Sequence, residues 1–232
     1  MYPTPEEAIV VRAAERLMSK TMARYDSSHD AYHVERVRKT ALRIALKLPD
    51  DSKRPDLLTI EVAALLHDVL DKKYVSAEQA ADPYAFFLPF FQSCAAQGGV
   101  DLVADGRAHD VAKIVDNVSW STEKKLRTSG LITPWHKECI ELHCVQDADR
   151  LDAIGAFGIM RCAAFSTVSS RPLHAPFGDS AQDSSAIQHF HDKLLHIRDH
   201  LKTAPGKQMA VKRHQFMIDF LQAVDDEYNG EL

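Results

Sequence analysis

Apolar residues recur at helical spacing along nearly the whole of this 232-residue chain, whereas the alternation typical of β-strands is hardly found. The segment that opens at Ser27 or Ser28 shows the pattern, because its apolar residues fall on one helical face: Val34, Val37, Ala41, Ile44 and Leu48. Each such helix must bury its apolar stripe against other helices. We therefore expect an all-α fold, built as a helical bundle.

Capping and helix-breaking residues divide the chain into elements. The run Thr4–Glu7 has the threonine, proline and glutamate of a capped helix start, and Pro134 is expected to begin another helix. Helices are predicted at about 4–25, 27–48, 55–70, 83–96, 106–118, 139–149, 151–165, 184–201 and 208–228. Residues 119–133 are predicted to be a connection, and 166–183 a long loop that is a candidate active-site flap. Pro205-Gly206 is expected to separate the last two helices.

The bulk composition argues against several kinds of partner. A net charge of -5 gives no general reason to bind nucleic acid, and the longest apolar run, 85–91, is too short for a membrane span and contains a proline. The four cysteines lack the paired spacing of zinc ribbons and are typical of a reducing compartment. The first residues do not show the basic segment followed by an apolar stretch that is typical of a secretory signal. We expect a cytoplasmic protein, or alternatively a nuclear one, that binds no membrane and no specific nucleic acid; the oligomeric state is not indicated.

The apolar run Glu61–Leu70 contains His67 and Asp68 side by side. A carboxylate beside an imidazole among core residues is costly unless something compensates its charge. A divalent cation does so economically, because it neutralises the carboxylate and satisfies the imidazole nitrogen together. The dipeptide therefore indicates a metal site.

Further ligands are available on two other predicted helices. His33 lies on the second helix, and Asp149 and Asp152 are three residues apart on a later one, so that they can point the same way. Three half-apolar helices can bring His33, His67, Asp68 and Asp149 around one point in a bundle core. Two imidazoles and two carboxylates suit one divalent ion of intermediate hardness. We favour Mn²⁺, with Mg²⁺, Fe²⁺, Co²⁺, Ni²⁺ or Zn²⁺ as alternatives.

No internal repeat and no flexible linker divides the chain. We therefore expect a single domain over 1–232, with a metal-binding core at about 26–165. The C-terminal helices at about 184–228 are expected to pack on this core.

Three motifs resemble those of the HD superfamily of metal-dependent phosphohydrolases: His29–Val37, Leu65–Lys72 and Asp147–Gly155. They are most similar to the small single-domain branch that includes bacterial nucleoside triphosphate pyrophosphohydrolases. Ala186–Leu195 also matches that branch, so that the resemblance covers nearly the whole chain.

The resemblance implies that His33, His67, Asp68 and Asp149 are the metal ligands. The family's last ligand is the aspartate before arginine in Ala-Asp-Arg-Leu, which selects Asp149 rather than Asp147. Neighbouring aspartates then orient the helix or the ligands.

Five further residues are candidates for the reaction itself. Asp71, one turn after the histidine of the dipeptide, is placed to orient or deprotonate a water molecule, and His29 is a candidate proton donor or phosphate contact. Lys72 and Arg36 are expected to meet phosphate charge. Lys193 is expected to reach a phosphate from the C-terminal helices.

The implied activity is hydrolysis of a phosphoester or phosphoanhydride, with a nucleoside triphosphate cut to monophosphate and pyrophosphate as the leading case. One alternative is an HD-type di-iron oxygenase, which would need extra ligands from His109, His136 or His143. The other is a non-catalytic HD module that binds a nucleotide. The chain has no P-loop, no dinucleotide-binding glycine motif and no HExxH motif.

Overall fold

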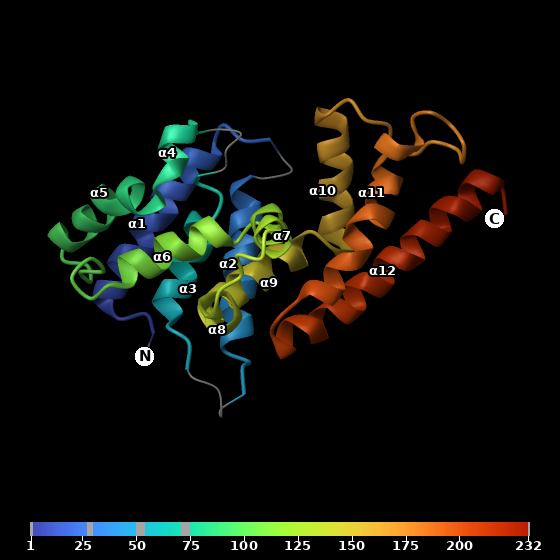
Figure 1. Ribbon diagram of the computed structural model, residues 1–232. Helices are drawn as coiled ribbons and strands as arrows, with labels where there is room; N and C mark the ends of the chain where they lie inside the picture. Colours follow the sequence, from blue (N-terminus) through green and yellow to red (C-terminus); the bar gives the residue numbers. More distant parts are fainter. Residues whose placement is uncertain (1, 27–29, 50–53, 71–74, 232) are drawn as a thin grey trace.

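The computed structural model describes residues 2–26, 30–49, 54–70 and 75–231, and every regular element within these ranges is helical (Figure 1). The predicted all-α fold is therefore confirmed. In chain order the elements are α1 (Pro5–Met22), α2 (Ala31–Ala45), α3 (Leu57–Leu66), α4 (Ala77–Ala81), α5 (Pro83–Ala96), α6 (Arg107–Asn117), α7 (Trp120–Thr128), α8 (Pro134–Glu138), α9 (Ile140–Asp152), α10 (Gly155–Val168), η1 (Gln182–Ser184), α11 (Ala186–Asp192), η2 (Leu194–His200) and α12 (Ala204–Asn229).

Side-chain caps set the starts of the helices that matter most for the site. Asp30 begins α2, because its Oδ1 accepts a hydrogen bond of 2.9 Å from the backbone N–H of His33. Asp56 begins α3 in the same way, through the N–H of Thr59 at 2.6 Å. The cap of α2 thus lies one turn from a predicted metal ligand and fixes the backbone that carries it.

Helix α3 lies at the centre of the core. Every residue from Leu58 to Leu66 is buried, which is the pattern of a helix covered on all sides. It packs against α1, α2, α6 and α9. His67 and Asp68 directly follow its last turn, so that the end of the most buried helix positions them.

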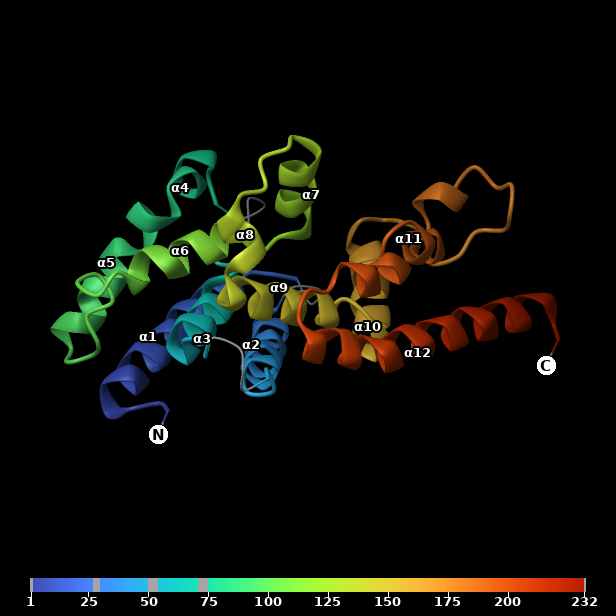
Figure 2. The ribbon, with the colours of Figure 1, turned by 60° about the horizontal axis from the view of Figure 1, so that its bottom comes forward.

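Helix α9 links two groups of helices. Figures 1 and 2 show α1, α3, α5 and α6 on one side of α9, and α10, α11 and α12 on the other. Buried Asp147 of α9 accepts hydrogen bonds from the backbone N–H groups of Lys202 and Thr203, at 2.9 and 2.8 Å, and from the Thr203 hydroxyl at 2.7 Å. These bonds tie the start of α12 to α9. The predicted boundaries of a single domain stay a prediction.

Three of the predicted secondary-structure assignments were wrong. Residues 119–133 contain α7, whose surface is mostly polar and therefore lacks an apolar stripe; only Glu123 of this helix is buried. Residues 184–201 form α11 and the 3-10 helix η2 rather than one helix. Pro205-Gly206 does not end a helix but lies in the first turn of α12, where Thr203 caps it.

Among the described residues, no single helix has both the length and the apolar character needed to cross a membrane. By these two measures alone, α9 and α10 could do so as a pair bent by 69°.

Candidate metal centre

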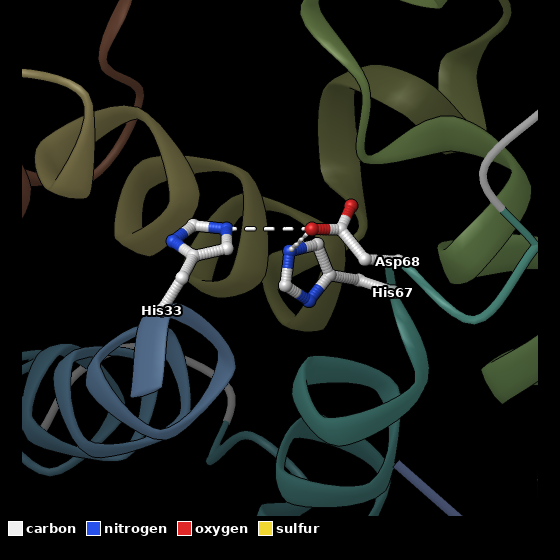
Figure 3. Close-up of side chains that lie close together, drawn as sticks. All are labelled: His33, His67 and Asp68. Atoms are coloured by element: carbon white, nitrogen blue, oxygen red, sulfur yellow. Dashed lines mark ion pairs between the residues drawn. The ribbon is translucent and has the colours of Figure 1, made fainter. Parts of the chain in front are cut away.

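Three of the predicted ligands meet at the end of α3. The donor atoms of His33, His67 and Asp68 all lie within 4.8 Å of one another (Figure 3). Asp68 Oδ2 is 3.4 Å from His33 Nε2 and 3.3 Å from His67 Nε2. Residues 34 positions apart in the chain thus share one point because α2 packs directly against α3.

Asp149 completes the predicted set. Its Oδ1 lies 3.6 Å from His33 Nε2 and 4.0 Å from His67 Nε2. Helix α9 contacts both α2 and α3, which brings this carboxylate to the same point. The structure therefore gathers two imidazoles and two carboxylates, as the helical spacing predicted; their role as ligands is a proposal, taken up below.

The protonation pattern of the two rings fits a cation. The Nδ1 of His67 donates to the Ala64 carbonyl at 2.8 Å, and the Nδ1 of His33 donates to Asp152 Oδ2 at 2.7 Å. In the neutral form of each ring, the proton is then on Nδ1 and the lone pair of Nε2 faces the carboxylates. Lone pairs turned toward carboxylate oxygens repel one another unless a positive charge lies between them.

Two buried atoms support the same interpretation. Within the described part of the chain, His67 Nε2 and Asp68 Oδ2 are buried and make no hydrogen bond. Buried polar atoms are almost always satisfied, so that this pair points to a missing partner. The partner has to be electrophilic, because carboxylate oxygen and imidazole nitrogen are both electron donors.

The electrostatics of the cluster demand positive charge. Burial by itself lowers the pKa of His67, but the carboxylates of Asp68 and Asp149 outweigh burial and raise that pKa to about 9. Burial opposes ionisation of Asp68, yet His67 and His33 hold its pKa well below its usual range. The cluster therefore favours a bound proton or cation, and the donor set fits a divalent metal ion.

Asp152 supports the cluster from behind. Besides the bond from His33 Nδ1, it accepts from Arg36 Nε at 2.8 Å, from Arg36 Nη2 at 3.0 Å and from Arg161 Nη1 at 3.2 Å. Burial tends to raise the pKa of Asp152, but His33 and Arg36 lower it far below its usual value. Asp152 thus stays ionised and holds the His33 ring in place.

Arg36 has a different neighbourhood from the one expected. Its guanidinium is bound to Asp152 on one side and lies over the Phe157 ring, 4.2 Å from the ring centre. Arg36 is also not among the residues that line the cavity beside the cluster. This geometry gives it a positioning role, and the predicted phosphate contact stays a prediction.

Three predicted reaction residues, His29, Asp71 and Lys72, lie outside the described residues. Their expected roles therefore stay predictions.

A cavity of 660 Å³, called here the metal cavity, opens beside the cluster. His67, Asp68 and Asp149 contribute to its wall. Other parts of the wall, on and around α10, α11 and η2, carry cationic side chains: Arg161, Arg171 and Lys193. The aromatic side chains of Trp120 and Phe165 also line it. A site with anionic and cationic parts and aromatic rings suits a cation together with a phosphorylated ligand.

Lys193 lines this cavity, and its predicted phosphate contact stays a prediction. Sequence reasoning missed Arg161 and Arg171, which also line the cavity. For Arg161 a signal was present, since it is the only charged residue of the apolar helix α10. This is the same signal that singled out His67 and Asp68. Arg171 lies in the loop after α10 and has no such context.

A di-iron site would need a second set of ligands. In the described ranges, the one candidate metal cluster is that of His33, His67 and Asp68. His109 stacks on Tyr84, with ring centres 3.5 Å apart. His143 donates to the backbone carbonyl of His136 at 2.9 Å instead.

Comparisons with known proteins identify relatives and similar structures of this chain. No family model matches it. The Bacillus subtilis protein YpgQ is 33% identical over 209 residues, which cover 88% of this chain and 86% of YpgQ. The structure of an HD-superfamily hydrolase from Bacillus thuringiensis superposes with a TM-score of 0.69 at 26% identity, covering 96% of this chain and 98% of that one. The structure of YpgQ in complex with ADP superposes with a TM-score of 0.64 at 28% identity, covering 92% and 97%.

A helical fold with histidine and aspartate side chains gathered at the end of its most buried helix is that of an HD-type hydrolase. The chain belongs, with YpgQ, to the HD superfamily of metal-dependent phosphohydrolases.

Proposed function

We propose that this protein hydrolyses a nucleoside triphosphate to the monophosphate and pyrophosphate, using one divalent cation, with Mn²⁺ favoured, held by His33, His67, Asp68 and Asp149. The observation that carries the proposal is that these four side chains gather at one point and that three of them, His67, Asp68 and Asp149, line a cavity whose wall also carries cationic side chains. The ADP bound to YpgQ, a relative over most of the chain, supports a nucleotide as the ligand.

A divalent cation held by these residues would supply Lewis-acid chemistry, polarising a phosphoryl oxygen and lowering the pKa of a water molecule. The chain prepares the site through hydrogen bonds on the far side of each ring. Ala64 and Asp152 fix the Nδ1 protons of His67 and His33, so that both Nε2 atoms face the cation position. Arg36 keeps Asp152 oriented in turn.

The cationic wall has the chemistry to hold the phosphate chain. Arg161, Arg171 and Lys193 offer charge-assisted hydrogen bonds to phosphoryl oxygens. These contacts would orient the phosphoanhydride toward the His–Asp cluster and stabilise the negative charge that grows during its cleavage. Trp120 presents an aromatic surface against which a nucleobase can stack.

Three residues outside the described ranges are proposed to take part in the reaction. Asp71 is proposed to orient the attacking water and take its proton, and Lys72 to meet phosphate charge. His29 is proposed as a proton donor or phosphate contact.

The test is turnover of a nucleotide panel by the purified protein, with each divalent metal added in turn. Pyrophosphate and orthophosphate are measured separately, because their ratio identifies the bond that breaks. We expect metal-dependent pyrophosphate release, lost in His67→Ala and Asp68→Ala and kept in the control His191→Ala, whose side chain is exposed. Activity that survives loss of either proposed ligand, or the absence of turnover with every metal, would overturn the proposal.

A further inference from the structure

A second cavity, of 510 Å³, lies among α7, α8, α9 and the segment before α12. Six of the residues that line it carry ionisable side chains: Glu123, Arg127, His136, Lys137, His143 and Lys202. It shares no lining residue with the metal cavity. Its volume is within the range of small-molecule sites.

Glu123 is the one acidic residue in this wall, and three cations already share it. Its Oε1 accepts from Arg127 Nε at 2.8 Å and Nη2 at 2.6 Å. Its Oε2 accepts from Arg150 and lies 3.3 Å from Lys202 Nζ. One carboxylate cannot neutralise three cations, and Lys137 adds a fourth at the cavity wall.

Other groups around the cavity do not remove the excess. The carboxylate of Asp147 lies nearby, but it accepts its hydrogen bonds from the backbone and hydroxyl groups at the start of α12. His136 Nδ1 accepts from the Thr133 N–H at 3.1 Å, and its Nε2 donates to Asn117 Oδ1 at 3.1 Å. The histidine hydrogen bonds therefore involve neutral groups.

The titration of the wall is consistent with a positive potential. Burial lowers the pKa of His143, and the nearby Lys202 lowers it further. Burial also lowers the pKa of His136, as do Lys113 and Lys202. The pKa of Lys202 itself is lowered by burial and by Arg150, although Glu123 opposes this shift.

We propose that this second cavity binds a small phosphate-bearing anion on Arg127, Lys137 and Lys202. Arginine and lysine recognise phosphate oxygens through charge-assisted hydrogen bonds, and a multivalent anion neutralises several cations at once. Lys202 is half-buried at the inner wall, whereas Arg127 and Lys137 are exposed, so that an entering anion meets charge along its path. The site is separate from the proposed hydrolytic site and stands whether or not that proposal holds.

One ion pair separates the two cavities. Arg150 lines the metal cavity, and its Nη2 donates to Glu123, which lines the second. The metal cavity also carries cations, so that a phosphate-bearing probe can enter both. The experiment therefore needs a signal from each cavity.

Histidine side chains provide these signals. The 232-residue chain, labelled with ¹⁵N at histidine and loaded with diamagnetic Mg²⁺, is titrated with inorganic pyrophosphate. His136 and His143 report on the second cavity, and His189 reports on the metal cavity. Single histidine-to-glutamine variants assign the resonances.

We expect saturable shifts at His136 and His143 in the wild type. The double variant Arg127→Gln/Lys137→Gln should weaken this binding by about tenfold or more, because two charged contacts are lost. The matched control Lys124→Gln/Lys125→Gln removes the same charge from exposed positions of α7 that do not line the cavity, and should bind as the wild type does. Shifts at His189 alone, or unchanged affinity at His136 and His143 in the Arg127→Gln/Lys137→Gln variant, would overturn the proposal.

Discussion

At the scale of single residues, the metal centre depends on side chains that do not face the cation. Asp152 accepts from His33 Nδ1 at 2.7 Å and is itself held by Arg36 and Arg161. It thereby fixes which nitrogen of His33 carries the proton. The position of the ligand atom is set by a residue 119 positions away in the chain.

We predict that Asp152→Asn lowers metal affinity by about 10–100-fold, the usual cost of losing such a partner. Asparagine keeps the shape but loses the charge that holds the imidazole proton and the two arginines. Calorimetric titration with Mn²⁺ measures the change, and Asp110→Asn, at an exposed position of α6, is the control. An unchanged affinity would show that Asp152 does not support the ligand.

The lowered pKa of Glu123 predicts how the stability of the fold depends on pH in the acid range. Burial tends to raise its pKa, but Arg150 and Lys202 lower it from 4.5 to about 2. A carboxylate with a depressed pKa stabilises the fold above its unfolded-state pKa, and this stabilisation is lost as the pH falls toward the folded-state value. The window is therefore between about pH 4.5 and pH 2, and the size of the effect is on the order of 3 kcal/mol.

The measurement compares the free energy of unfolding of the wild type and Glu123→Gln in urea as the pH is lowered. The difference between the two proteins should be largest at pH values above 4.5 and should shrink below that pH. A difference that is constant with pH would mean that the Glu123 charge does not stabilise the fold.

The sequence was informative about residues whose charge conflicts with their surroundings. His67 and Asp68 stand in an apolar run, and His33 and Asp149 lie on helix faces that meet them. The phosphate contact expected of Arg36 stays a prediction, and spacing alone did not show which residue holds Arg36, because it assigns a residue to a helix face but does not identify its partner. That partner, Asp152, lies on a helix 116 positions later in the chain.

At the scale of elements, the junction of α9 and α10 shapes the metal cavity. Gly158 lines this cavity, and a Cβ added there would lie 2.4 Å from the Ala153 carbonyl oxygen. The contact is with backbone, so that no side-chain rotation relieves it. The close approach lets α10 bend away from α9 while it presents Arg161 to the cavity.

We predict that Gly158→Ala destabilises the protein by about 1–3 kcal/mol, the usual cost of overpacking. Because α10 must shift, Arg161 should move and the KM for the nucleotide should rise more than kcat falls. Thermal unfolding and steady-state kinetics measure the two effects. Ala156→Ser, at an exposed position of the same helix, should change neither; a wild-type Tm and KM in Gly158→Ala would contradict the close contact.

Elements with an apolar stripe could be predicted, and those without one could not. Helices α2 and α3 were found by periodicity, since each buries apolar residues against its neighbours. Helix α7 was missed because it is polar on nearly every side and buries only Glu123, in an ion cluster. Pro205 was taken for a break between helices, although a proline in a first turn also favours a helix start.

At the scale of the whole molecule, α9 connects the metal centre to the C-terminal helices. Asp149 and Asp152 both lie against His33 of α2, whereas Asp147 accepts from the start of α12. The spacing along one helix explains the division, because residues two apart point to different sides. The resemblance in the sequence left Asp147 outside the expected ligand set but did not identify α12 as its partner.

This arrangement allows a test of the predicted single domain. Asp147→Ala removes the acceptor for the Lys202 and Thr203 N–H groups and for the Thr203 hydroxyl, and should destabilise the protein by about 2–5 kcal/mol. If the chain folds as one unit, hydrogen exchange should accelerate equally in α12 and in the buried helix α3, since both would open only by global unfolding.

Faster exchange confined to α10–α12, with α3 protected as in the wild type, would mean that the C-terminal helices form a separate unit. In that case the cations of the metal cavity would sit on a lobe that can move relative to the His–Asp cluster.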